Sequence, residues 1–153
     1  MSLLKRFDDD LKEALKASNA RKVSVLRMVK AALKNRQIEK GGELADEEIV
    51  TVLATMIKRG RESVEQFTRG GRLDLVRNEE AEMAVLQSYM PPQLSNDEID
   101  GIISGAIRES SAKGPQDMGK VMRILMPRVK GVADGKYVNQ RVKEMLESVK
   151  QAG

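Results

Sequence analysis

The side chains available for chemistry are carboxylates, hydroxyls, thioethers and cations, because the 153-residue sequence contains neither histidine nor cysteine. This absence removes thiol nucleophiles, Cys or His zinc ligands, the imidazole base of a Ser/His/Asp triad and the usual proton shuttle at neutral pH. The P-loop motif GxxxxGK(S/T), the HExxH motif and the EF-hand loop are absent, and no GxGxxG follows a strand. We therefore predict no catalytic residue, no cofactor and no metal site.

Two runs of carboxylates remain as candidates for acid/base chemistry or for Mg²⁺ binding. They consist of Asp46, Glu47 and Glu48, and of Asp74, Glu79, Glu80 and Glu82. Each run falls in the first turns of a predicted helix, where the helix dipole favours acidic side chains. We interpret both runs as charge that stabilises helix ends.

Two further patterns suggest chemistry but fit ordinary structure better. The two serines before Lys113 have the residue types of a serine/lysine hydrolase, yet no glycine-rich segment surrounds them to form an oxyanion hole. Met118, Met122 and Met126 are spaced like ligands for a soft metal or like the lining of an adaptable groove. They alternate with valine and leucine on one helical face, so we interpret them as core.

Basic residues gather in two segments, as is typical of surfaces that contact nucleic-acid phosphates. Between positions 21 and 40, seven Lys or Arg stand against one acid, Glu39. Arg27, Lys30 and Lys34 share one side of the helix expected there, and we assign them as a secondary basic face. Between positions 120 and 150, eight Lys or Arg stand against three acids. The competing interpretation is that both runs are solvated helix faces.

The second basic segment supplies the main candidate contacts with RNA. Lys136, Lys143 and Lys150 recur every seven residues and so share one side of the last predicted helix. A basic, glycine-containing stretch leads into that helix, whose free amides and dipole can hold a phosphate. Tyr137 is the single aromatic residue of the segment, so binding should read RNA shape and phosphates rather than unpaired bases. The predicted RNA-binding residues are Lys120, Arg123, Arg128, Lys130, Lys136, Asn139, Arg141 and Lys143.

These candidates must be positioned by helices, because hydrophobic periodicity predicts seven helices and no convincing strand. The first is expected over about residues 2–17, the fourth from about residue 74 and the last over about residues 134–150. The expected helix stops are Gly41-Gly42, Gly70-Gly71, Pro91-Pro92, Lys113-Gly114-Pro115 and Pro127. The fold class is therefore all-α: a larger N-terminal lobe of about four helices, residues 1–92, followed by a small three-helix C-terminal bundle, residues 93–153.

Several helix ends and contacts have their own sequence signals. Asn19 precedes the second helix as a capping candidate. Ser95 and Glu98 form a capping box, with Leu94 and Ile99 placed to close a hydrophobic staple around it. Gly60 interrupts an apolar stripe at a cost of about 1 kcal/mol relative to Ala, which predicts a close helix crossing there.

The segment that opens the sequence mixes Lys and Arg with three aspartates and has no apolar run long enough for a signal-peptide core. No stretch approaches the roughly 18 apolar residues of a membrane span. The absence of cysteine fits a reducing compartment. We expect a cytoplasmic protein with no membrane partner.

The order and spacing of motifs along nearly the whole chain resemble the YqeY family. In the first part these motifs are Arg21-Lys22, the segment 26–32, Arg61-Glu62-Ser63, Glu65-Gln66-Phe67, Tyr89-Met90-Pro91 and Gln93-Leu94-Ser95. In the second part they are Gly119-Lys120-Val121-Met122, Leu125-Met126-Pro127, Lys130-Gly131, Ala133-Asp134-Gly135 and Val138-Asn139. The resemblance implies the same two helical lobes that the periodicity predicts.

The YqeY family is similar to the helical tail of the GatB component of the glutamine-dependent aminoacyl-tRNA amidotransferase, which converts misacylated Glu-tRNA(Gln) or Asp-tRNA(Asn). The resemblance implies that such a tail grips tRNA, while glutamine hydrolysis and kinase-like activation lie in other parts of that enzyme. It therefore implies a tRNA-handling module without a catalytic body. By family association it also implies a link to carbon–nitrogen ligase activity with glutamine as amide donor.

The chain departs from the family pattern at three positions. Arg123 stands where the family usually has Gly, and Val132 stands where an Arg is common. If that missing arginine contacts phosphate elsewhere, Arg123 or Arg128 must compensate here. Ala45 replaces a usual Thr or Ser ahead of Asp-Glu-Glu, which gives up a helix cap worth about 1 kcal/mol.

Three hypotheses about function follow. The leading one is a non-catalytic module that binds tRNA or similarly structured RNA. The second is an adaptor that docks on a protein, such as an aminoacyl-tRNA amidotransferase or a synthetase, through an exposed apolar groove, for which the nine methionines are the hint. The third is that the chain itself contributes to amide transfer, which the absence of His, Cys and a nucleotide-binding loop disfavours.

Overall fold

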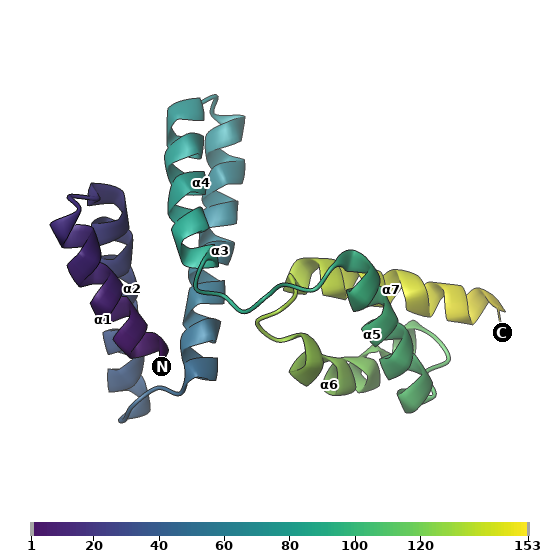
Figure 1. Ribbon diagram of the computed structural model, residues 1–153. Coiled ribbons are helices and arrows are strands. Elements are labelled where there is room, and N and C mark those ends of the chain that lie inside the picture. Colours follow the sequence, from purple (N-terminus) through teal and green to yellow (C-terminus); the bar gives the residue numbers. More distant parts are fainter. Residues whose placement is uncertain (1, 153) are drawn as a thin grey trace. The chain divides into compact units, whose positions relative to one another are not determined.

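The computed structural model describes residues 2–152, and over that range it is built from α-helices joined by short turns (Figure 1). The helices are α1 Leu3–Lys16, α2 Ala20–Lys40, α3 Asp46–Arg69, α4 Leu73–Gln87, α5 Asn96–Ser110, α6 Met118–Val129 and α7 Gly135–Ala152. A short 3₁₀ turn, η1 Pro115–Asp117, precedes α6. No strand occurs between residues 2 and 152, which confirms the all-α prediction and its seven helices.

The chain forms two compact units with separate cores. Unit 1, Met1–Met90, contains α1 to α4, and unit 2, Pro91–Gly153, contains α5 to α7. The buried side chains of each unit form one apolar cluster, and no buried side chain belongs to both clusters. The division into independent domains at residues 92 and 93 stays a prediction.

α1 and α2 of unit 1 begin at residues whose side chains cap the helix, and α2 also ends at a glycine cap. The Asn19 side chain accepts a hydrogen bond from the Lys22 N–H at 3.2 Å, and the Ser2 hydroxyl accepts one from the Lys5 N–H at 3.3 Å. α2 ends at Gly41, whose φ of 78° lies in the left-handed region that favours glycine. The predicted cap at Asn19 and the predicted stop at Gly41 are both confirmed.

The start of α3 is only half capped, as the presence of Ala45 predicts. Ala45 offers no side-chain acceptor to the first turn. The Glu48 carboxylate accepts a hydrogen bond from the Ala45 N–H at 3.1 Å and pairs with the Lys40 ammonium at 2.6 Å. One of the two reciprocal hydrogen bonds of a capping box is therefore present.

The core of unit 1 is aliphatic and comes mainly from α2 and α3. The buried residues of these two helices are Val25, Leu26, Val29, Leu33, Ile49, Leu53, Ile57 and Gly60. α3 packs side by side with α4 (Figure 1). A Cβ atom added at Gly60 would lie 2.7 Å from both Cγ and Sδ of Met83 in α4. The close helix crossing predicted at Gly60 is confirmed.

α4 ends at Gln87, so the prediction that Pro91-Pro92 ends this helix is wrong. The Ser88 hydroxyl donates to the Val85 carbonyl at 2.6 Å, and the Tyr89 N–H donates to the Leu86 carbonyl at 3.1 Å. These bonds tighten the backbone ahead of the prolines. The physical reason is burial: Tyr89 leaves the helix and inserts into the core of unit 1, where it is 3% exposed.

Tyr89 connects the end of α4 to α1 through three contacts. Its ring meets Phe7 edge-on with centroids 4.8 Å apart, and the Arg6 guanidinium lies 4.6 Å from its centroid. Its hydroxyl donates to the Asp10 carboxylate at 2.5 Å. Burial, followed by this hydrogen bond, raises the pKa of Tyr89 well above its usual value.

α5 of unit 2 begins with the predicted capping box. The Ser95 hydroxyl accepts a hydrogen bond from the Glu98 N–H at 3.1 Å, and the Glu98 carboxylate accepts one from the Ser95 N–H at 3.2 Å. Leu94 and Ile99 both pack in the core of unit 2, as a hydrophobic staple requires. The Leu94 N–H donates to the Val132 carbonyl at 2.8 Å, which ties the approach to α5 to the loop before α7.

α6 continues past Pro127 to Val129, so the predicted stop at Pro127 is wrong. A proline in the last turn removes only its own N–H from the helix. Val129 is 3% exposed and packs in the core of unit 2. The burial of Val129 favours two more helical residues over a turn at the proline.

Replacing Ala45 with Ser should complete the second capping box. The added hydroxyl can accept the Glu48 N–H, so we expect the free energy of unfolding to rise by about 1 kcal/mol. Urea unfolding followed by circular dichroism measures this change. Ser95→Ala, which removes the corresponding hydroxyl of α5, should lower stability by a similar amount. A neutral result for both variants would contradict the capping interpretation.

Replacing Gly60 with Val should destabilise unit 1, because Cβ of the new side chain collides with Met83. We expect a loss of about 1–3 kcal/mol, as for overpacked cores. Thermal unfolding of the full chain provides the measurement. The double variant Gly60→Val/Met83→Ala should lose less than the sum of its single variants, since the truncated Met83 leaves space for Val. Additive losses would show that the two side chains do not compete for this space.

Candidate RNA-binding surface

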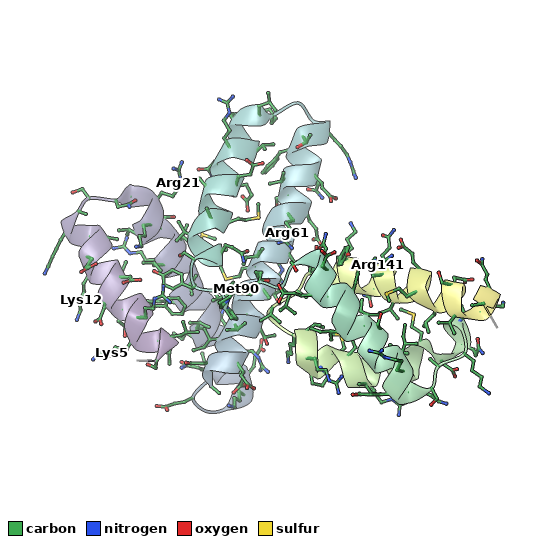
Figure 2. The ribbon with its side chains drawn as sticks, turned by 45° about the vertical axis from the view of Figure 1, so that its right-hand side comes forward. Lys5, Lys12, Arg21, Arg61, Met90 and Arg141 are labelled. Carbon is green, nitrogen blue, oxygen red and sulfur yellow. The ribbon has the colours of Figure 1, made fainter. Side chains whose placement is uncertain are left out.

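The cations of unit 2 lie on helix faces turned away from the core. α6 buries Val121, Leu125 and Val129, and α7 buries Val138, Val142 and Leu146. Because an α-helix repeats every 3.6 residues, Arg123 of α6 and Lys136 and Lys143 of α7 lie away from these buried positions and are exposed. Charged side chains project from the helices on these outer faces (Figure 2).

The outer face of α7 carries a row of lysines. Lys136, Lys143 and Lys150 are exposed and follow one another every seven residues, a spacing of about 10 Å along the helix axis. Asn139 is exposed between the first two. An open hollow of about 440 Å³ on this face is lined by Lys136, Asn139, Gln140, Lys143 and Glu144. The structure therefore brings three predicted residues, Lys136, Asn139 and Lys143, to one place.

A second pair of cations lies on α6 and directly after it. Arg123 is on the outer face of α6, and Lys130 follows the last residue of the helix. Both side chains are exposed and make no hydrogen bond or ion pair with any residue between 2 and 152. Lys120 also points outward, with its ammonium 3.8 Å from the Asp117 carboxylate. This region presents two unpaired cations and one that is loosely paired.

Arg128 is held by an acid of the neighbouring helix. Its guanidinium donates to both carboxylate oxygens of Glu109, at 3.1 and 2.8 Å. This pair links α6 to α5, and both side chains are about half exposed. The positive charge of Arg128 is therefore balanced locally, unlike that of Arg123 and Lys130.

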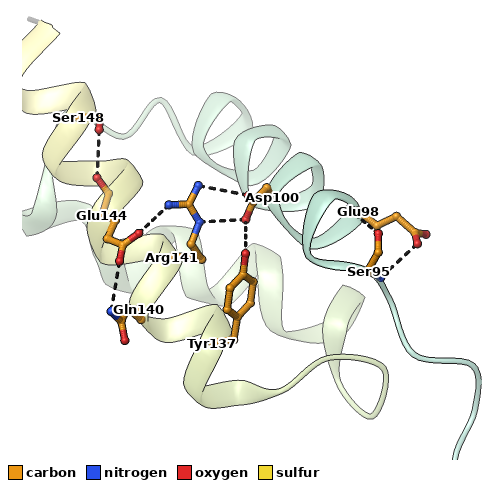
Figure 3. Close-up of polar contacts among 8 residues, drawn as sticks. All are labelled: Ser95, Glu98, Asp100, Tyr137, Gln140, Arg141, Glu144 and Ser148. Carbon is orange, nitrogen blue, oxygen red and sulfur yellow. Dashed lines mark hydrogen bonds and ion pairs between the residues drawn. The ribbon is translucent and has the colours of Figure 1, made fainter.

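Arg141 lies at the centre of a polar network between α5 and α7 (Figure 3). Its Nε and Nη2 donate to the two oxygens of Asp100 at 3.0 and 3.2 Å, and its Nη1 donates to Glu144 at 2.6 Å. The Tyr137 hydroxyl donates to Asp100 at 3.1 Å. With its side chain 30% exposed and two carboxylates in contact, Arg141 acts mainly as a link between helices.

The charges in this network shift the pKa values of its members. The hydrogen bond from Arg141, with a smaller contribution from Tyr137, holds the pKa of Asp100 below its usual value. The hydrogen bond from Arg141 likewise lowers the pKa of Glu144. Desolvation, followed by the hydrogen bond to Asp100, raises the pKa of Tyr137. Each shift favours the ionised Arg–carboxylate pair and a protonated tyrosine.

The N-terminus of α7 is capped by the chain itself. The Asp134 carboxylate accepts a hydrogen bond from the Lys136 N–H at 3.0 Å. A carboxylate at this end already occupies one of the free amides that a phosphate would use. The predicted phosphate position at this helix start is therefore less favourable than the lysine row on the outer face.

The acids of α5 that hold Arg128 and Arg141 were not anticipated from the sequence. Asp100 lies 41 residues before Arg141 in the chain, and Glu109 lies 19 residues before Arg128. Such separations leave no local spacing signal. Gln140 was missed as well, although it follows Asn139 directly and lines the same hollow.

The secondary basic face on α2 is divided by an ion pair with α1. The Lys30 ammonium lies 2.7 Å from the Asp8 carboxylate. Arg27 lines a separate apolar hollow between the two helices. Lys34 is exposed further along α2. Of the three residues, Arg27 and Lys34 remain cationic at the surface without a balancing acid among residues 2–152.

Residues 2–152 contain no group of three or more Asp or Glu side chains arranged to hold a metal ion. Within the same range, no helix combines the length and the apolar character needed to cross a membrane.

Seven helices in two units, with cations on the outer faces of α6 and α7, define an all-helical protein with a basic face. A family model described as Yqey-like protein matches residues 4–146. The chain belongs to the YqeY family, which confirms the resemblance seen in its motifs.

Curated relatives of the chain carry the name "Altered inheritance of mitochondria protein 41, mitochondrial". The one from Pyrenophora tritici-repentis (strain Pt-1C-BFP) is 30% identical over 147 residues, which cover 94% of this chain and 81% of the relative. The one from Lachancea thermotolerans is 29% identical over 109 residues, 69% of this chain and 58% of the relative. The one from Saccharomyces cerevisiae (strain YJM789) is 33% identical over 101 residues, 65% of this chain and 53% of the relative. None of these names states a catalytic activity.

The names of these relatives overturn the expected cytoplasmic location, because all three are mitochondrial proteins. The expectation was wrong for a physical reason. The lack of cysteine and of a long apolar run fits the interior of an organelle as well as the cytosol, so these features do not distinguish the two compartments.

The Asp100–Arg141 pair predicts a pH-dependent contribution to stability. Because folding lowers the pKa of Asp100, its contribution is present above the unfolded value of about 4 and is lost as pH falls through the folded value. We expect Asp100→Asn to have a lower free energy of unfolding than the wild type at pH 7. The difference in free energy should become smaller at about pH 3. Urea unfolding across this range measures the difference. Glu147→Gln on the exposed face of α7 is the control, and a difference for Asp100→Asn that is independent of pH would contradict the assignment.

Proposed function

We propose that the chain is a non-catalytic module that binds tRNA or similarly structured RNA through the outer faces of α6 and α7. The observation that carries this proposal is that three of the predicted RNA-binding residues of unit 2, Arg123, Lys130 and Lys143, are exposed cations without acidic partners among residues 2–152. Cations that are already balanced within the fold gain less from phosphate than cations that face water alone. The geometry thus favours these three over Arg128 and Arg141.

Contact with phosphate and with RNA shape suits this surface better than contact with unpaired bases. Single-stranded bases are usually held by stacking on aromatic side chains. Tyr137 is half-buried and its hydroxyl is engaged by Asp100, so it offers no stacking platform. Lysines two helical turns apart, with Asn139 between them, can reach successive phosphates and sugar hydroxyls.

Within this proposal the predicted residues divide by role. Lys136, Asn139 and Lys143 on α7, together with Arg123 on α6 and Lys130 directly after it, contact RNA directly. Arg141 and Arg128 hold the helices in place through Asp100 and Glu109 and present less free charge. Lys120 contributes at the edge, where Asp117 partly balances it.

The similarity of the YqeY family to the helical tail of the amidotransferase component GatB supports an accessory role in tRNA-dependent amidation or translation. In this role the chain handles tRNA while another protein carries the chemistry. We expect the purified chain alone to make no Gln-tRNA from Glu-tRNA, glutamine and ATP. Formation of that product would favour the alternative, in which the chain itself takes part in carbon–nitrogen ligase activity.

A titration with tRNA at about 50 and 200 mM salt tests the proposal, because phosphate contacts release counterions and weaken steeply with salt. We expect Lys136→Glu/Lys143→Glu and Arg123→Glu/Lys130→Glu each to weaken binding by about tenfold or more. Lys5→Glu/Lys12→Glu is the matched control, since it makes the same charge change at the same seven-residue spacing on α1 (Figure 2). Binding that is insensitive to salt, or that the control weakens equally, contradicts the proposal.

A further inference from the structure

α2 carries apolar and small side chains on two opposite sides. One side packs in the core of unit 1 through Val25, Val29 and Leu33. The other side has Ala20, Ser24, Ala31 and Ile38, which are exposed and which follow the helical repeat along one face. Burial in the core of unit 1 accounts for the first side and leaves the second unexplained.

The second side forms one wall of an apolar groove with the end of α1. The groove is shallow and open to solvent, with a volume of about 740 Å³, and Leu15, Val23, Ser24, Arg27, Met28 and Ala31 contribute to its lining. Leu15 is 50% exposed and Met28 is 49% exposed. Further along the same face of α2, Ile38 is 70% exposed. Large apolar side chains gathered in this way are typical of an interaction surface rather than of scattered surface residues.

The charge around the groove is positive. Arg27 lines it and Lys34 continues the same face, whereas Glu39 is the single acid of α2 and lies 3.7 Å from Arg36. Lys30 at the edge is balanced by Asp8. Arg21 and Lys12 project outward from the two helices that form the groove (Figure 2). A partner with complementary charge must therefore be acidic around an apolar centre.

We propose that this groove docks an amphipathic helix of a partner protein, with apolar side chains facing Leu15 and Met28 and acidic side chains facing Arg27 and Lys34. From Ala20 to Ala31 the face is about 16 Å long, or three helical turns. Alanine and serine along α2 let another helix approach closely, and a flexible methionine adapts to its side chains. A helix laid in a groove between two helices is a common mode of peptide recognition.

Other occupants fit less well. A second copy of the chain would bring Arg27 and Lys34 of both copies together, and like charges oppose such pairing. RNA gains little from the exposed Leu15, Met28 and Ile38, because phosphates and sugars require polar and cationic partners. The groove lies in unit 1 and the proposed RNA surface lies in unit 2, so this inference does not rest on the proposed function.

A synthetic helical peptide tests the proposal with the full chain. The probe has about 18 residues, with Leu on one face and Glu on the others, and its control replaces each Glu with Lys. We expect the acidic peptide to bind with a Kd of about 100 µM or tighter, measured by fluorescence anisotropy, and the basic peptide to bind at least tenfold more weakly. Amide shifts in NMR spectra should concentrate at Leu15, Ser24, Met28 and Ala31.

Two matched variants localise the effect. Ala31→Glu places bulk and negative charge in the groove and should weaken binding of the acidic peptide by about tenfold or more. Ala84→Glu makes the same change at an exposed alanine of α4 and should leave binding within about twofold of the wild type.

Four results would overturn the proposal. The first is no binding of the acidic peptide, and the second is equal binding of the acidic and basic peptides. The third is an equal loss of peptide affinity in Ala31→Glu and Ala84→Glu. The fourth is amide shifts at the groove that depend on protein concentration or on added tRNA instead of the peptide. Concentration dependence would assign the groove to a second copy, and tRNA dependence would assign it to RNA. The α6 and α7 variants test only the proposed RNA-binding surface, and the peptide experiments test only the groove. One proposal can therefore fail while the other holds.

Discussion

The burial of aliphatic side chains along one face of each helix is the constraint on which the rest of the structure depends. With aromatic residues at only 3% of the sequence, the cores rely on valine, leucine and isoleucine, and each such side chain contributes about 1.5–3 kcal/mol when fully buried. The aliphatic face of a helix must therefore be continuous and must meet its neighbour closely. Gly60 has no side chain, so α3 can approach Met83 of α4 closely. Tyr89 follows the end of α4 and packs against Phe7 of α1.

Placing the apolar side chains inward also determines which charges remain available at the surface. Basic residues are frequent on every outer face, but acids on neighbouring helices engage some of them. Asp100 forms an ion pair with Arg141, Glu109 with Arg128, and Asp8 with Lys30. The surface that remains cationic is therefore smaller than the sequence suggests. Of the predicted residues, it includes Arg123, Lys130 and Lys143 in unit 2 and Arg27 and Lys34 on α2.

Local signals predicted the helices well because their physical causes are local. Asn19, Gly41 and the Ser95–Glu98 box act within one turn of the chain, so residue types alone reveal them. The stops at Pro91-Pro92 and Pro127 were misplaced because burial decides where these helices end. Tyr89 enters the core and α4 ends ahead of its prolines, whereas burial of Val129 keeps α6 helical beyond Pro127. Burial depends on partners distant in sequence, which a single helical pattern does not contain.

The candidate sites were predictable only in part for the same reason. Spacing correctly placed Lys136, Asn139 and Lys143 on one face of α7. Glu109, the partner of Arg128, and Asp100, one of the two partners of Arg141, lie on α5, and nothing in the segments of the two arginines identifies them. Glu144, the other partner of Arg141, lies three residues further along α7. The apolar groove beside α2 was expected only in general terms, from methionine content, and its position required the packing of α1 against α2.

The two separate cores have a consequence for how the chain loses structure. A cooperative folding unit is held together by shared buried contacts, and the apolar clusters of unit 1 and unit 2 share no buried side chain. A fluctuation that opens the core around Val138 and Val142 therefore removes no buried contact within the core around Val29 and Leu53. We expect amide hydrogen exchange in the two units to report two distinct opening free energies. A single melting temperature for the whole chain would average over both of them.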